Sequence, residues 1–131
     1  MRIIAIIARY LLGLLFTLFG LNGFLHFLHP QPPHSALAMQ FLTVMSVSHY
    51  VIPVFAFQLA GGLLLLSGRF VPLALTFLAP VLVNILTYHI TMDPGGIGPA
   101  VVATILWILV FVRYRANFQG LFESGARSTT A

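Results

Sequence analysis

Residues 11–28 read LLGLLFTLFGLNGFLHFL, a run that contains no charged side chain. About 20 apolar residues are needed for a helix to cross the hydrocarbon core of a bilayer, so this stretch predicts a transmembrane helix. Arg2 and Arg9 precede it, as they would precede a secretory signal. The run is longer than the apolar core of such a signal, however, and no pair of small residues follows it as a cleavage site. We therefore expect it to remain in the mature chain.

Three further apolar runs follow, separated by helix breakers. The four runs predict spans at about 9–28, 50–67, 70–92 and 97–114. Proline, glycine and turn-forming residues punctuate the chain at 29–34, 67–69 and 93–96. The sequence thus predicts an all-α polytopic membrane protein, a four-transmembrane-helix bundle forming a single membrane domain over 1–131. We expect the polar tail at 123–131 to be mobile.

The long segment between the first two spans carries its own helical signal. Apolar residues recur at helical spacing from Leu37 to Met45, and Ser35 precedes them as an N-cap. This pattern predicts a short interfacial helix, at about 35–48, in the first external loop. The alternative for this segment is an irregular apolar loop.

The composition agrees with a lipid environment. The chain is 60% hydrophobic and only 6% charged, whereas soluble domains average about 25% charged residues. The net charge of +4 comes from scattered arginines without any lysine, which does not match a phosphate-tracking surface, so we expect no nucleic-acid partner. Without cysteine, disulfides, thiol relays and thiolate metal sites are excluded.

The basic residues indicate an orientation. All of them fall before the first span, between the second and third spans, or after the fourth: Arg2, Arg9, Arg69, Arg113, Arg115 and Arg127. The positive-inside rule then places both termini in the cytoplasm.

Polar residues inside the spans are the candidates for a site, because such groups usually face the bundle interior or a cavity. Five of them fall at similar depth in the outer half of the membrane: Asn22, His26, Gln58, Asn84 and His89. They form a candidate ligand-binding set, and no metal site is expected. His26 and His89 could bind haem or exchange protons with a quinone. In the competing interpretation the amides only hydrogen-bond one another across helices. His89 also lies about 140° around the helix from Asn84, which leaves their common orientation open.

Several segments together resemble one known family. They are GLNGFLH at 20–26, QLAGGLLLLSGRFVPLAL at 58–75, LAP at 78–80, and Asn84-Ile85 followed by His89. This pattern resembles the DoxX family of small bacterial membrane proteins over nearly the whole chain. The resemblance implies a four-helix protein of the bacterial inner (plasma) membrane. It also implies association with quinone-linked redox systems, such as thiosulfate:quinone oxidoreductase subunits, or with redox-stress complexes.

Three functional hypotheses follow. The first is a small subunit of a quinone-linked redox system that binds an apolar ligand in an outer-half polar pocket, as part of a membrane oxidoreductase and without independent activity. The second is a non-catalytic scaffold or accessory subunit, with redox proteins or further copies of the chain as partners. The third is a subunit that holds haem b between His26 and His89. No carboxylate lies inside any span, so we do not expect a proton-coupled exporter.

Overall fold

The computed structural model describes residues 1–125 and 128–129, and in that part of the chain all regular structure is helical. The elements in chain order are α1 (Arg2–Leu25), α2 (Ala36–Val47), α3 (Val51–Ser67), α4 (Val71–Thr91), the 3-10 turn η1 (Pro94–Gly96), α5 (Gly98–Tyr114) and the 3-10 helix η2 (Arg115–Phe122).

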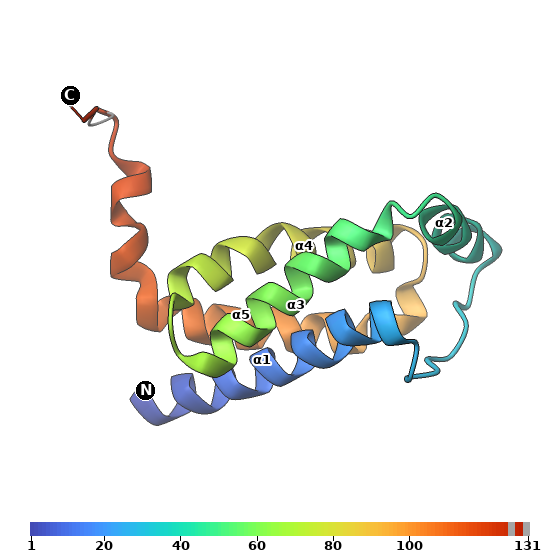
Figure 1. The fold of residues 1–131 in the computed structure, drawn as a ribbon, viewed down its shortest axis with the longest axis horizontal. Helices are drawn as coiled ribbons and strands as arrows, with labels where there is room; N and C mark the ends of the chain where they lie inside the picture. The colour runs from blue at the N-terminus through green and yellow to red at the C-terminus, as the bar shows by residue number, and fades with distance from the viewer. Residues whose placement is uncertain (126–127, 130–131) are drawn as a thin grey trace.

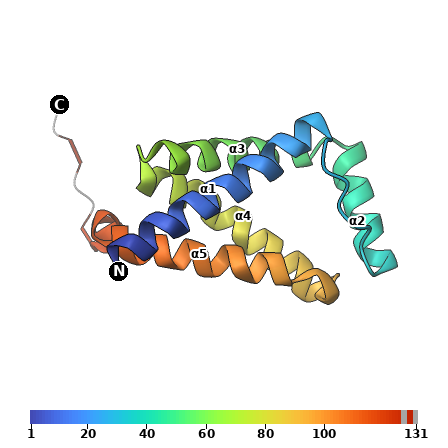
Figure 2. The same cartoon turned by 90° about the horizontal axis from the view of Figure 1, so that it is seen from below.

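Helices α1, α3, α4 and α5 form an up-and-down bundle (Figure 1, Figure 2). Around the bundle, α1 packs against α3 and α5, and α4 packs against the same two helices. The helix bounds agree with the expected spans to within a few residues, except that α1 begins as early as Arg2. The all-α, four-helix architecture predicted from the sequence is confirmed.

Length and hydropathy support membrane spans. Helices α1 and α4, and α5 together with η2, are each long and apolar enough to cross a membrane. Helix α3 has 17 residues, about 25 Å at 1.5 Å per residue. It passes the same test only together with α2, from which it is bent by 86°. The chain therefore has three candidate spans, or four if the bent pair supplies one.

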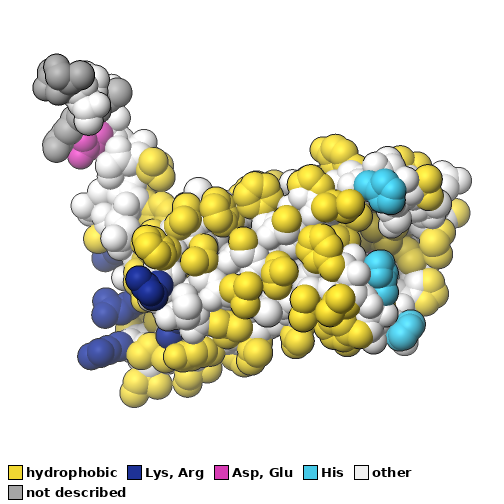
Figure 3. Space-filling view, viewed as in Figure 1, with side chains coloured by type: hydrophobic (Ala, Val, Ile, Leu, Met, Phe, Trp, Pro, Cys, Tyr) yellow, Lys and Arg dark blue, Asp and Glu magenta, His cyan; other side chains and the backbone are white. Residues whose placement is uncertain are grey.

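The surface is typical of a protein in lipid. The fully buried side chains are few, among them Leu12, Phe16 and Leu75, and they lie where the four helices meet. Large apolar side chains cover the visible flank (Figure 3). Arginines gather at one end of the bundle and histidines at the other (Figure 3). We call these the arginine end and the histidine end. Arg127 lies outside the described residues.

Glycines bring α1 and α3 into backbone contact, because small residues let two helices approach closely. A Cβ atom added at Gly20 would lie 2.6 Å from the backbone nitrogen of Leu59, and one added at Gly62 would lie 2.5 Å from the nitrogen of Thr17. Neither position has room for a side chain. The close approach of these two helices therefore depends on glycine.

The short helix predicted after the first span is also confirmed. The Oγ atom of Ser35 caps α2 by accepting a hydrogen bond from the Ala38 N–H at 3.0 Å. Helix α2 lies across the histidine end (Figure 2). It contacts α4 there through the rings of Phe41 and Tyr88, whose centroids are 5.7 Å apart.

Residues 115–122, for which the sequence makes no prediction, are helical. Helix η2 continues directly from α5 but turns away from the bundle (Figure 1). Its Phe118 ring packs on Phe111 at a centroid distance of 5.1 Å. The expected mobility of the tail at 123–131 stays a prediction, and residues 126–127 and 130–131 of it lie outside the described residues.

Candidate functional site

A cavity of about 310 Å³ lies among the four bundle helices, towards the histidine end. We call it the four-helix cavity, since all four helices and the loop after α1 contribute to its wall. Its wall has three polar residues, and all three are candidates from the sequence: Asn22, Gln58 and His89. The remaining wall residues are apolar: Leu15, Phe16, Phe19, Pro30, Phe55, Ile85, Pro99, Ala100 and Ala103. An apolar wall with a few polar groups is typical of sites for small organic ligands.

Gln58, in the middle of α3, is the most unusual of the three. Its side chain is only 6% exposed, yet among residues 1–125 and 128–129 no other group hydrogen-bonds to its amide. The only side-chain atom in the described residues that is both fully buried and without a hydrogen-bond partner is Thr17 Oγ1, so the small accessible surface left on Gln58 includes its amide. The amide lies on the cavity wall, so a molecule in the cavity can supply the missing hydrogen bonds.

Two glycines of α1 position this part of α3. A Cβ atom at Gly20 would lie 3.1 Å from the backbone carbon of Gln58, and one at Gly23 would lie 2.1 Å from the Phe55 ring. Because neither glycine has a side chain, α1 can pack directly against the turn of α3 that carries Phe55 and Gln58. The glycines thereby place both residues in the wall of the cavity.

Asn22 has a role in the fold as well as a place in the wall. Its Oδ1 atom accepts a hydrogen bond from the Leu28 N–H at 2.6 Å. Its backbone carbonyl accepts one from the His26 N–H at 2.8 Å. Asn22 thus stabilises the turn in which the chain leaves α1. Its amide nitrogen has no hydrogen-bond partner in the described part of the chain.

His89, in the last turn of α4, is fixed by a backbone contact. Its Nδ1 atom lies 3.2 Å from the carbonyl oxygen of Asp93. Since a carbonyl can only accept, Nδ1 carries the proton and donates. In the neutral ring, Nε2 is then the acceptor. The ring also meets the neighbouring Tyr88 ring edge-on, with centroids 4.9 Å apart.

Two of the five sequence candidates do not line this cavity. His26 is exposed and ends α1 in a left-handed conformation, with φ of 53°. Asn84 is exposed on α4, where its amide donates to the Pro80 carbonyl at 2.8 Å. It borders a separate groove between α3 and α4 instead. Because His26 is not in the wall with His89, the arrangement gives no support to haem held by this pair.

Beside the cavity lies a contact that the sequence did not predict, between His34 and Asp93. Asp93, only 5% exposed, accepts hydrogen bonds from both the backbone and the ring of His34. Asp93 also supplies the carbonyl that holds His89. The one feature of the sequence that could have drawn attention to this contact is that Asp93 is the only acidic residue before Glu123. That feature does not identify His34 as the partner of Asp93. No cluster of three metal-ligating side chains occurs within the described residues.

A chain with these spans and this apolar surface is a small polytopic membrane protein. Comparison with protein-family models, curated proteins and solved structures finds no match. The resemblance to the DoxX family therefore stays a prediction.

Proposed function

We propose that the four-helix cavity binds the head group of an apolar, quinone-like molecule, and that the chain serves as a small ligand-binding subunit of a membrane redox system. The observation that carries the proposal is Gln58, a largely buried residue on the wall of a mostly apolar cavity, whose amide has no hydrogen-bond partner in the described residues. The volume of about 310 Å³ is at the lower end of the range for organic ligands, which suits a single ring better than a haem.

The polar groups of the wall match both redox forms of a quinone. The free N–H groups of Gln58 and Asn22 can donate to a quinone carbonyl oxygen. The Nε2 atom of His89 can accept a hydrogen bond from a quinol hydroxyl, because Nδ1 is already engaged with Asp93. The apolar wall then surrounds the ring, and an isoprenoid tail extends into the lipid. The resemblance to the DoxX family adds to this proposal.

The proposal also includes location and partners. We place the chain in a bacterial inner membrane with the arginine end and both termini in the cytoplasm, in accordance with the positive-inside rule. The described arginines at that end are Arg2, Arg9, Arg69, Arg113 and Arg115. Electron transfer to or from the bound molecule would require a redox partner protein, which acts together with one or more copies of this chain.

The competing function is a non-catalytic scaffold, and one observation favours it. Asn22 and His89 each already have a hydrogen-bond partner within the fold, at Leu28 and at Asp93. In this interpretation the polar residues position loops and helices, and the cavity holds water or lipid. The two functions differ in what lies beside Gln58: the head group of a ligand in the first, and water or lipid in the second.

Binding of a short-chain quinone such as decylubiquinone tests the proposal. Trp107, the only tryptophan, lies one helical turn from the cavity residue Ala103 on α5, so a quinone in the cavity should quench its fluorescence. We expect Gln58→Leu to weaken quinone binding about tenfold, the effect of losing one hydrogen bond of about 1.4 kcal/mol.

Asn84→Leu provides the matched control. It also removes an amide near the middle of a span, but outside the four-helix cavity, and should leave quinone affinity unchanged. Absence of quenching in the unmodified protein, or equal loss of affinity in both variants, would favour the scaffold.

A further inference from the structure

A second polar cavity, of about 240 Å³, lies at the arginine end. Three arginines from two helices surround it: Arg2 and Arg9 of α1, and Arg113 in the last turn of α5. Gly68, in the turn between α3 and α4, and Tyr114 complete its polar wall. This cavity is at the opposite end of the bundle from the four-helix cavity and shares no residue with it.

The positive charge of this cavity is not compensated within the described protein. Arginine is always protonated, and in the described chain no carboxylate forms an ion pair with any of the three. Arg9 is held in place, because its guanidinium donates to the Leu65 carbonyl at the end of α3 and stacks on the Tyr10 ring at 4.4 Å. Three cations around one small cavity favour an anion between them.

The neighbouring surface indicates which class of anion would fit the basic cavity. A groove of about 360 Å³ runs between α1 and α5 at the same end and shares Ala5 and Arg113 with the basic cavity. Ile4, Leu109 and Val112 line the groove. An anion with attached apolar chains can therefore occupy both hollows at once. Free phosphate would occupy only the basic cavity and leave the groove empty.

We infer that the basic cavity binds the phosphodiester headgroup of an anionic phospholipid, with an acyl chain in the adjoining groove between α1 and α5. Guanidinium groups bind phosphate oxygens through paired N–H donors, and basic pockets at helix ends are a known form of lipid recognition. The occupied site joins the first span to the last through the lipid. It is independent of the proposed quinone site.

Native mass spectrometry of the detergent-solubilised protein tests the inference. The probe is phosphatidylglycerol offered together with phosphatidylcholine of the same acyl chains, and we expect one phosphatidylglycerol to bind preferentially. Arg2→Gln should weaken its binding roughly fivefold and Arg2→Gln/Arg113→Gln roughly thirtyfold, since each arginine near an anionic lipid contributes about that factor. Arg2 is exposed and has no partner in the described residues, so replacing it should not disturb folding.

Arg69→Gln is the matched control, because Arg69 lies at the same end but lines neither hollow. It should retain the preference for phosphatidylglycerol. An equal loss in Arg69→Gln would overturn the inference, since general attraction by the arginine end would then explain binding. Full retention by the double variant would overturn it too. Inorganic phosphate and glycerophosphoglycerol distinguish the source: if either displaces the lipid at equal concentration, the site holds a soluble anion and the lipid assignment is wrong.

Discussion

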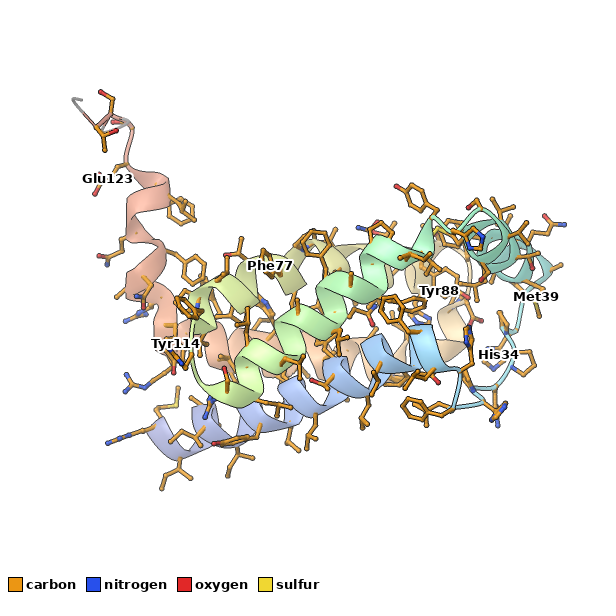
Figure 4. All side chains as sticks on the ribbon, in the orientation of Figure 1. His34, Met39, Phe77, Tyr88, Tyr114 and Glu123 are labelled. Carbon is orange, nitrogen blue, oxygen red and sulfur yellow. The ribbon has the colours of Figure 1, made fainter. Side chains whose placement is uncertain are left out.

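The Asp93 carboxylate accepts two hydrogen bonds from His34, one from the backbone N–H at 3.1 Å and one from the ring Nδ1 at 2.9 Å. This contact joins the loop before α2 to the loop after α4 at the histidine end; Figure 4 labels His34 at this end of the bundle. Burial by itself raises the pKa of the Asp93 carboxyl. The hydrogen bonds from His34 and the positive charges of His34 and His89 outweigh that effect and hold the pKa below its usual range.

The depressed pKa gives a pH dependence with a definite sign. A carboxyl whose pKa is lower in the folded protein adds stability above its unfolded pKa of about 3.9 and loses that contribution as the pH falls through the folded value. We therefore expect acid to destabilise the protein below about pH 4. Asp93→Asn should be less stable than the unmodified protein at pH 7 and should lose less on acidification. Thermal unfolding in detergent from pH 7 to pH 3 measures both effects; parallel curves for the two proteins would contradict the assignment.

The contact between α1 and α3 predicts the effect of a single methyl group. Gly20→Ala places a Cβ atom 2.6 Å from the Leu59 nitrogen and 2.9 Å from its Cα atom. Backbone atoms cannot move aside as a flexible side chain can, so the helices must separate. We expect a loss of about 1 to 3 kcal/mol in the free energy of unfolding, measured by denaturant titration in detergent.

Gly98→Ala is the control for this change. No atom lies within 4 Å of a Cβ added at Gly98, and alanine has the higher helix propensity. The stability of this variant should be unchanged or slightly raised. If Gly20→Ala and Gly98→Ala behave alike, the close packing of α1 on α3 is not what stabilises the bundle.

The topology can be measured directly, because the chain contains no cysteine and any introduced thiol is unique. Gln31 follows α1 and Gly96 precedes α5, both at the histidine end, whereas Arg69 joins α3 to α4 at the arginine end. We expect Gln31→Cys and Gly96→Cys to react with an impermeant maleimide added outside intact cells, and Arg69→Cys to react only after the membrane is opened. Labelling of Arg69→Cys alone from outside would reverse the proposed orientation. Labelling of all three from outside would contradict a membrane between the two ends.

Sequence patterns predicted the helices well because each pattern reports on a local property. Apolar run length predicted the bundle helices, and the Ser35 N-cap together with helical periodicity predicted α2. These features depend on residues close in the chain. The contact of His34 with Asp93 joins residues 59 positions apart, and no local pattern indicates it.

The candidate site was predicted in part, because depth in the membrane does not determine direction around the helix. Asn22, Gln58 and His89 line one cavity, as their common depth suggested. Asn84 has the same depth but faces outwards. Its amide needs no interior partner, since the Pro80 carbonyl of its own helix accepts its hydrogen bond. The direction of a mid-span amide thus depends on which group accepts its hydrogen bond. That group is known only from the packed structure.

The unpartnered amide of Gln58 leads to a prediction that separates a ligand site from a structural role. If Gln58 serves binding, its amide contributes nothing to the ligand-free fold, and Gln58→Leu should leave the stability of the empty protein unchanged or slightly raised. The same variant should lose the additional stability that decylubiquinone gives the unmodified protein. If Gln58 instead stabilises the bundle, Gln58→Leu should lower the unfolding temperature whether or not quinone is present. Thermal unfolding with and without decylubiquinone distinguishes the two, and Asn84→Leu, with its exposed amide, should retain the shift produced by the ligand.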